Sequence, residues 1–384
     1  MLNELVAPLS LDEFLRDHWA RNFLHLSGPA DRFADLFPWA VLNEALERQR
    51  FTGRRLRLVR SAKTIAAERY LNGDRVNAEK LTGELSDGAT LIFNRCDEVH
   101  PPLRDLCVSL ERVFHHRVYT NLYAGWRADN GFGVHWDAQN NFIVQVSGRK
   151  HWKVWKPNRV HPLRDEVETG LAPESEEPFW DGVLEQGCLL FIPRGWWHVA
   201  YPMDEQCLHL TVTLDSPTGI DLLHWLADRM KSSDAARSDV PVTGTEAERR
   251  EWLAKIRADL TAALDDETIE RFVAHKDAGI PQRPRISYPD DVVRGPVVLR
   301  KAMPLQLASA ELLKFARNGE ALICNAAGTE FPIDTDVGEK IRRFNDRRPH
   351  SLEEFSAGSD VRFKALVGAL VMKGILKRVE STAG

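Results

Sequence analysis

The sequence has few cysteines, and several common catalytic motifs are missing from it. Only five cysteines occur among 384 residues, and none of them forms a Cys-x-x-Cys pair. A disulfide framework and a structural zinc site are therefore not expected, and the pattern favours reduced thiols in the cytosol. Neither a Gly-x-Ser-x-Gly motif nor a phosphate-binding glycine loop occurs, so the sequence predicts neither a serine nucleophile nor a nucleotide site.

Long hydrophobic runs are also missing. No stretch approaches the ~18 consecutive apolar residues that a membrane span requires. Residues 1–6 lack the basic stretch and apolar core of a secretory signal. We therefore expect a soluble, cytoplasmic protein without a membrane partner.

The overall charge gives no general attraction to nucleic acid. The formal net charge is −5, with 43% hydrophobic and 28% charged residues, so the chain is able to bury a core. A local basic group lies near the C-terminus, but acidic residues are interleaved with it. Because of this mixture a supporting role for the C-terminal part is favoured, and nucleic-acid contact is not predicted. The basic group consists of Arg342, Arg343, Arg347 and Arg348.

Two short stretches carry a candidate metal site. Residues 133–137 read GVHWD, which sets His135 and Asp137 two positions apart. On one β-strand this spacing projects both side chains onto the same face, about 6.5 Å apart, a span that they can close around one ion. His198, at the end of PRGWWH, is the candidate third ligand. Two histidines and one carboxylate form a facial triad, which suits non-haem Fe(II) because adjacent coordination positions stay open.

A β-hairpin pattern follows the first two candidate ligands. Residues 141–148 alternate in polarity and end at a glycine, and residues 151–155 alternate again. Lys150 begins the returning strand, where its ammonium can face the same interior as the metal. In that position it would pair with the far carboxylate of a dicarboxylate cosubstrate. The alternative is an ordinary solvent-exposed lysine.

At these residues the chain resembles the JmjC-type 2-oxoglutarate oxygenases, in particular their ribosomal-oxygenase and asparaginyl-hydroxylase branch. The resemblance implies that Fe(II) binds to the two histidines and the aspartate, that Lys150 binds the 5-carboxylate of 2-oxoglutarate, and that O₂ is the oxidant. It also puts Asn121 and Asn141 near the cosubstrate. The matching residues are His135, Asp137, Asn141, Phe142, Gln145, Gly148, Arg149, Lys150, Trp152, Pro193, Trp196, Trp197 and His198.

The substrate is less well defined by the sequence. The resemblance implies hydroxylation of a histidine or arginine side chain, most simply in a ribosomal protein. Residues 138–140 read AQN, whereas relatives of the ribosomal type often have acidic residues there. An asparaginyl or other protein hydroxylase and a tRNA-base hydroxylase therefore stay open. So does a catalytically silent binding protein on a cupin barrel, while a cupin-type isomerase would need a further ligand near the first pair.

The predicted fold is α+β with three parts. Residues 1–218 would form a double-stranded β-helix (jelly-roll, JmjC/cupin) barrel with N-terminal α/β elements and a core at about 89–215. A polar insertion at 157–181 is either a solvated loop or a lid. Period-3.6 patterns at 219–290 predict a helical domain, and the resemblance favours homodimerisation there. Residues 291–384, including a helix expected at 309–317, look like a winged-helix domain.

Overall fold

The structure is a computed structural model that describes residues 2–127, 131–166, 172–280, 283, 304–309, 312–318, 321–326, 329–355 and 361–379. Contacts divide the chain into two compact units, residues 1–216 and 217–384. Each unit contains its own hydrophobic core.

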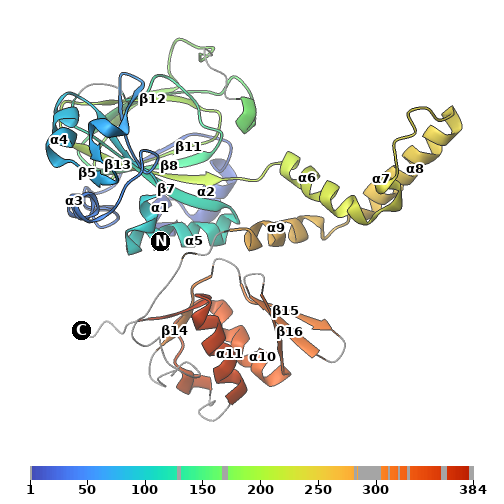
Figure 1. Cartoon of the computed structure of the whole chain (residues 1–384). Helices are drawn as coiled ribbons and strands as arrows, with labels where there is room; N and C mark the ends of the chain where they lie inside the picture. The colour runs from blue at the N-terminus through green and yellow to red at the C-terminus, as the bar shows by residue number, and fades with distance from the viewer. Residues whose placement is uncertain are drawn as a thin grey trace. The chain divides into compact units, whose positions relative to one another are not determined.

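An eight-stranded antiparallel sheet forms the centre of the first unit (Figure 1). The sequence pattern of residues 118–126 predicts a barrel strand, and the structure confirms it as β7 (Arg117–Gly125), which pairs with a strand on each side. The strands, in spatial order, are β1 (Leu24–Leu26), β11 (Leu189–Ile192), β8 (Asn140–Ser147), β13 (Cys207–Asp215), β7 (Arg117–Gly125), β6 (Thr90–Phe93), β2 (Leu56–Arg60) and β3 (Lys63–Ile65).

A second, three-stranded antiparallel sheet consists of β10 (Trp180–Leu184), β9 (Lys150–Trp155) and β12 (Trp197–Pro202), with β9 in the middle. The predicted hairpin joins β8 of the first sheet to β9 of the second. Its turn requires Gly148, because φ is +65° and a Cβ there would lie 2.1 Å from the Gln206 carbonyl oxygen. Apolar side chains of both sheets, such as Ile143 and Trp152, belong to one buried cluster between them.

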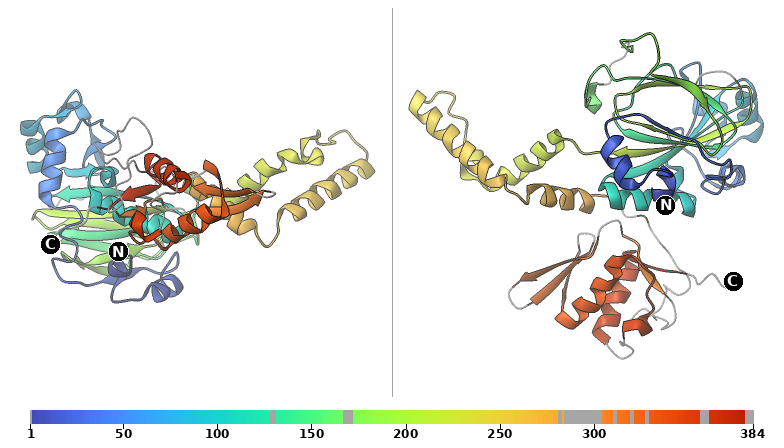
Figure 2. Two further views of the ribbon diagram at one scale, coloured as in Figure 1. Left: turned by 90° about the horizontal axis from the view of Figure 1, so that it is seen from below. Right: turned by 180° about the vertical axis from the view of Figure 1, so that it is seen from behind.

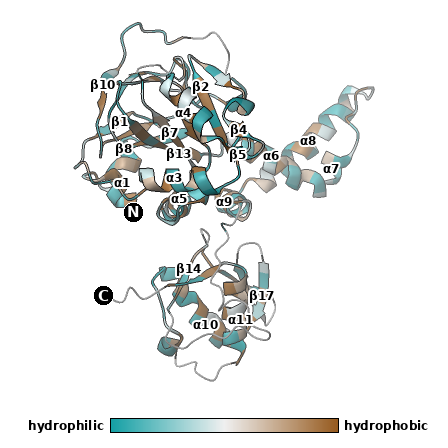
Figure 3. Cartoon of the chain, turned by 60° about the vertical axis from the view of Figure 1, so that its left-hand side comes forward, coloured by the Kyte–Doolittle hydropathy of each residue, from teal (hydrophilic) through white to brown (hydrophobic). Residues whose placement is uncertain are grey.

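Alternation along the strands gives the larger sheet two different faces. Leu122, Val144 and Leu210 belong to the main core on the helix-covered face. Their neighbours Tyr123 and Ile143 point to the opposite face, toward the smaller sheet and the cavity described below. Brown, hydrophobic strands in Figure 3 mark the buried centre of this unit.

Helices cover the core face of the larger sheet, as the two views of Figure 2 show for the region near the N-terminus. Residues 10–13 read SLDE, a pattern that predicts a capping box at the start of a helix. The structure confirms it at α2 (Leu11–Asp17), where Ser10 and Glu13 are bonded to each other's backbone N–H. A small hairpin, β4 (Leu71–Asn72) and β5 (Arg75–Val76), accompanies them. The helices are α1 (Leu2–Val6), α2 (Leu11–Asp17), α3 (Trp39–Arg48), α4 (Ala78–Ser86) and α5 (Pro101–Phe114).

The second unit begins with four helices, which confirms the change to helical periodicity. They are α6 (Gly219–Arg229), α7 (Asp234–Arg237), α8 (Glu246–Ala263) and α9 (Thr268–Ala278). Trp225 and Leu226 of α6 pack with Phe272 of α9 in a small buried cluster. In contrast, α8 buries none of its 18 residues.

The C-terminal part of the second unit combines short strands with two helices around Phe344 and Phe363. The helix predicted at 309–317 is wrong: Lys314–Asn318 is a strand, because it pairs antiparallel with Ala321–Ala326. The elements are β14 (Leu305–Leu307), β15 (Lys314–Asn318), β16 (Ala321–Ala326), β17 (Thr329–Ile333), α10 (Thr335–Arg342), α11 (Val361–Met372) and β18 (Leu376–Arg378). β14 pairs with β18, and β15, β16 and β17 form a separate sheet.

The domain predictions have different outcomes. The boundary between the two units, at 216/217, lies two residues from the predicted end of the catalytic part. The predicted boundary at 290/291 falls outside the described residues, so the division of the second unit stays a prediction. None of the helices in the described part of the chain is long and apolar enough to cross a membrane.

Candidate metal centre

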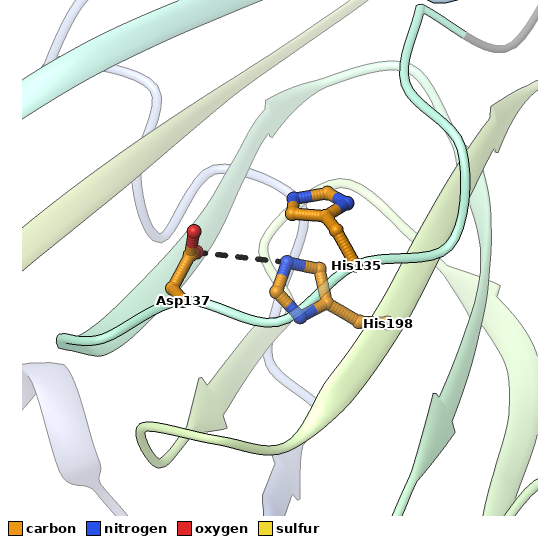
Figure 4. A group of neighbouring side chains, drawn as sticks. All are labelled: His135, Asp137 and His198. Carbon is orange, nitrogen blue, oxygen red and sulfur yellow. Dashed lines mark ion pairs between the residues drawn. The ribbon is translucent and has the colours of Figure 1, made fainter. Parts of the chain in front are cut away.

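The structure brings His135, Asp137 and His198 together. Their ligand atoms all lie within 4.8 Å of one another, and Nε2 of His198 is 3.6 Å from Oδ2 of Asp137 (Figure 4). The two imidazole rings are 4.4 Å apart between centroids. Two nitrogens and one carboxylate oxygen are thus arranged around one point, which is a suitable donor set for a divalent transition metal.

The backbone that achieves this is not the strand expected from the sequence. His135 and Asp137 lie in an extended loop, and only His135 forms a β-bridge, with His198. The two residues exchange both backbone hydrogen bonds, with N···O distances of 3.1 and 2.7 Å. Residues paired in this way project their side chains to the same side, so the bridge, rather than strand periodicity, brings the two imidazoles together.

Backbone carbonyls fix the ring nitrogens of both histidines. Nδ1 of His135 lies 2.8 Å from the Gly133 oxygen, and Nδ1 of His198 lies 3.1 Å from the Trp196 oxygen. A carbonyl oxygen only accepts, so each Nδ1 carries the proton and donates it. The lone pair of each Nε2 is therefore free for a metal, an arrangement typical of metal-ligating histidines.

Asn141 orients the carboxylate. Its Nδ2 donates to Oδ2 of Asp137 at 2.6 Å. The sequence predicted Asn141 to lie near the cosubstrate, but its side chain is not among those that line the cavity. Its observed contact is with the candidate ligand.

Burial keeps His198 neutral. Removal from water, together with the nearby His135, lowers the pKa of His198 to about 4, although Asp137 and the Trp196 carbonyl act in the opposite direction. A neutral imidazole is the form that binds a metal, so this histidine is ready to act as a ligand at neutral pH.

The three residues lie in a cavity of about 270 Å³ between the two sheets. The strand registers explain which side chains line the cavity. Tyr123 pairs with His209, and Trp152 pairs with Ala200, so the two side chains of each pair lie on the same face of their sheet. The cavity is lined by Arg57, Thr90, Tyr123, Gly131, Phe132, His135, Asp137, Ile143, Lys150, Trp152, His198, Ala200, His209 and Thr211. Trp152 was among the residues that carry the family resemblance, whereas Arg57 and Thr90 were not singled out from the sequence. The alternation of Leu56, Arg57 and Leu58 nevertheless sets Arg57 opposite the core face.

Lys150 lines the same cavity and is only 5% exposed. Burial lowers the pKa of its ammonium. No carboxylate lies within ion-pair distance of it in the described part of the chain. Two further polar atoms of the lining, Nε1 of Trp152 and Nδ1 of His209, are buried and have no hydrogen-bond partner among the described residues. Groups left unpaired in this way are suited to hold a polar, anionic ligand.

Asn121 is oriented differently from the expectation. Its Oδ1 accepts a hydrogen bond from the backbone N–H of Arg95 at 3.0 Å. It does not line the cavity, but Tyr123 does. A direct role of Asn121 at the cosubstrate stays a prediction.

The polar segment 157–181 separates the two halves of the site in sequence. Residues 167–171 lie outside the described part. Elsewhere the segment is anchored, since Oδ1 of Asn158 accepts from Nε1 of Trp197 at 2.9 Å and Arg164 pairs with Asp215. Whether it acts as a lid stays a prediction.

Several curated proteins that are similar to this chain carry the same name. The "Bifunctional lysine-specific demethylase and histidyl-hydroxylase NO66" of Drosophila persimilis is 29% identical over 215 residues, which are 55% of this chain and 31% of that protein. The protein of the same name from Caenorhabditis briggsae is 35% identical over 113 residues, or 28% of this chain and 15% of that protein. The chain thus spans less than a third of the length of these relatives.

Solved structures share the fold along the whole chain. The ribosomal oxygenase YcfD from Escherichia coli, in complex with cobalt and 2-oxoglutarate, superposes with a TM-score of 0.63 at 20% identity and covers 97% of this chain and 99% of that one. This superposition confirms the barrel fold that the sequence predicted. Residues 98–222, which include all three candidate ligands and Lys150, match the family described as JmjC domain. This match covers about a third of the chain, and that third contains the whole candidate metal centre.

Proposed function

We propose that this chain is an Fe(II)- and 2-oxoglutarate-dependent oxygenase that hydroxylates an amino-acid side chain of a protein. The observation that carries the proposal is that donor atoms of His135, Asp137 and His198 lie within 4.8 Å of one another in a cavity that also holds the buried Lys150. Three protein ligands leave open positions on the ion, and Lys150 supplies the charge for a dicarboxylate. The hydroxylase activity in the relatives' name and the cobalt and 2-oxoglutarate of the YcfD complex support the assignment.

Each residue has a distinct task in this mechanism. When bound, Fe(II) and 2-oxoglutarate supply the oxidative chemistry, in which O₂ is consumed and succinate, CO₂ and a hydroxylated substrate are released. The two histidines offer Nε2, and Asn141 holds the Asp137 carboxylate in place. Lys150 binds the distal carboxylate, and aromatic side chains such as Trp152 exclude water from the cavity.

Succinate release from 2-oxoglutarate tests the proposal. We expect slow turnover without substrate that requires Fe(II) and is lost in His135→Ala and in Asp137→Ala. A matched control is His151→Ala, because this histidine lies on the outer side of β9, where it contacts Asp181. Turnover that persists in both ligand variants would contradict the assignment.

The proposed substrate is a ribosomal protein, hydroxylated on a histidine or arginine side chain. The term "ribosomal oxygenase" in the name of the similar YcfD structures supports this choice. Intact-mass comparison of ribosomal proteins from cells with and without this chain should reveal one added oxygen. An unchanged mass for every ribosomal protein would direct the search to other proteins.

We further propose that α6–α9 hold a second copy of the chain and that residues 304–379 form a winged-helix-like supporting part. Leu253 and Leu260 are exposed on α8, as is Leu264 directly after it, and they support the first proposal, because a soluble protein rarely leaves a contiguous apolar face in water. Short strands packed around α10 and α11 support the second. The cytoplasmic location stays a prediction.

A further inference from the structure

Arg57 is a cationic residue of the cavity that the proposed mechanism does not use. It lies on β2, and its side chain lines the same cavity as the metal-ligand candidates. Within the described part of the chain its side chain makes one hydrogen bond, from Nη2 to Oγ1 of Thr64, at 3.2 Å. No carboxylate of the described residues forms an ion pair with it, so most of its N–H donors remain available to the cavity.

Arg57 and Lys150 lie in different parts of the cavity. Arg57 pairs with Ile92, Ile92 pairs with Tyr123, and Tyr123 pairs with His209. Adjacent strands are about 4.8 Å apart, so three steps place the Cα atoms of Arg57 and His209 on the order of 14 Å apart. Burial lowers the pKa of His209, and the charge of the nearby Lys150 lowers it further. Lys150 is thus near the His209 end, and Arg57 lines the opposite one.

The charges of the cavity do not balance once its ligands are bound. Among the described residues that line the cavity, Asp137 is the only one with a carboxylate, and it offsets Lys150. The 2-oxoglutarate dianion offsets a divalent metal ion. Within the described lining, Arg57 therefore remains as an uncompensated positive charge, at the part of the cavity that the cosubstrate leaves to the substrate. A second cation brought beside it would be repelled, and more strongly than in water because the site is partly enclosed.

We propose that Arg57 determines substrate specificity by excluding cationic side chains, so that the hydroxylated residue is a neutral histidine rather than an arginine or a lysine. This inference rests on the proposed function. It selects one of the two substrate types named above. It also favours the histidyl-hydroxylase over the lysine-demethylase activity in the relatives' name. Methylated lysine is a cation, whereas the imidazole of histidine is neutral above its ordinary pKa.

A binding experiment tests the charge selection without any turnover. The full chain, loaded with Zn(II) and 2-oxoglutarate, is titrated with methylguanidinium, and binding is followed by saturation-transfer NMR. We expect Arg57→Glu to bind this probe at least tenfold more tightly than the wild type, with Arg57→Gln between them. Arg54→Glu is the control, since this nearby arginine is exposed, does not line the cavity and changes the net charge equally.

Equal binding of methylguanidinium by the wild type and Arg57→Glu would overturn the proposal. Circular dichroism of each variant separates this outcome from misfolding. If the glutamate variant does not fold, the comparison of Arg57→Gln with the wild type decides the role of Arg57 instead.

A second experiment identifies the oxidised residue. Ribosomal proteins from cells that lack this chain are incubated with the full chain, Fe(II) and 2-oxoglutarate, and peptides are sequenced by mass spectrometry. The added oxygen is expected on histidine. Oxygen on arginine, or loss of methyl from lysine, would overturn the specificity proposal alone. Absence of both oxidation and succinate release would instead contradict the proposed function, and the methylguanidinium titration would still decide the role of Arg57.

Discussion

Single residues of the metal centre were predictable to different degrees. His135, Asp137 and His198 were recognisable because their residue types and order match a facial triad, and Lys150 because it begins the strand after a hairpin turn. The contact of Asn141 with Asp137 was not predictable, since it depends on side-chain direction at the start of β8. Arg57 was missed because a cation on a distant strand carries no motif, and only the sheet register brings it to the cavity.

Asn141→Ala should weaken metal binding without removing a ligand. The Nδ2 donor holds Oδ2 of Asp137 at 2.6 Å, and its loss leaves the carboxylate free to rotate. Loss of such an outer contact typically lowers metal affinity by about 10–100-fold. Titration of the apoprotein with Co(II), followed by absorbance, measures this change. Gln139→Ala removes a nearby amide that makes no hydrogen bond to Asp137, and an equal loss of affinity in both variants would contradict the role assigned to Asn141.

Lys150→Ala should raise the KM for 2-oxoglutarate more than it lowers kcat. The buried ammonium is expected to bind the distal carboxylate, away from the reacting atoms, so its contribution is mainly to binding. A charge-assisted pair of this kind is worth about 1.5–3 kcal/mol, or roughly 10–150-fold in affinity. Lys150→Arg should recover part of the loss. An unchanged KM in the alanine variant, from succinate release at varied 2-oxoglutarate, would contradict this role.

At the scale of elements, the sequence predicted strands with clear alternation more reliably than the connections between them. β7 and the β8–β9 hairpin follow directly from alternation and the glycine at 148. The segment of His135 and Asp137 was expected to be a strand, but its only ladder contact is the bridge to His198. Residues 309–317 contain good helix formers, yet pairing of Lys314–Asn318 with β16 outweighs this local preference.

A buried histidine joins two elements of the C-terminal part and should make their contact depend on pH. His350 exchanges backbone hydrogen bonds with Leu305 of β14, each at 2.8 Å. Its Nε2 contacts Asp346 at 2.8 Å and its Nδ1 contacts Glu354 at 3.0 Å. Both carboxylates only accept, so both ring nitrogens donate, as in the imidazolium form. Burial lowers the pKa of His350, but the two carboxylates outweigh it and raise the pKa above 6.5.

The sign of the effect follows from this raised pKa. Protonated His350 stabilises the folded state fully below the unfolded-state pKa of about 6.5, and the contribution is lost as pH rises through the higher folded-state pKa. Hydrogen exchange of residues 304–309, corrected for intrinsic rates, should therefore show less protection at about pH 8.5 than at about pH 6. His350→Gln should lose this pH dependence, and His224→Gln, at an exposed site, should keep it. The same pH dependence in His350→Gln would contradict the assignment.

At the scale of the whole molecule, the length of the chain predicted several parts, and the structure divides it into two compact units. The first boundary was predictable because period-2 alternation changes to period 3.6 after residue 216. The sequence does not predict which surfaces join two copies of the chain, because an apolar helix face packs equally well against its own chain or against another one. The structure narrows this choice for α8, since none of its residues is buried within the chain and hydrophobic residues, brown in Figure 3, recur along its ribbon.

Disruption of the apolar face of α8 should convert a dimer to a monomer. Leu253 and Leu260 are 53% and 38% exposed, and they lie with Ile256 on one side of the helix because they are spaced by three and four residues. Leu253→Asp combined with Leu260→Asp would bury two unpaired charges in such an interface. Sedimentation should give a twofold larger mass for the wild type than for the double variant. Ala258→Asp introduces a charge on the opposite side of α8 and should leave the dimer intact, whereas a monomeric wild type at micromolar concentration would rule out this interface.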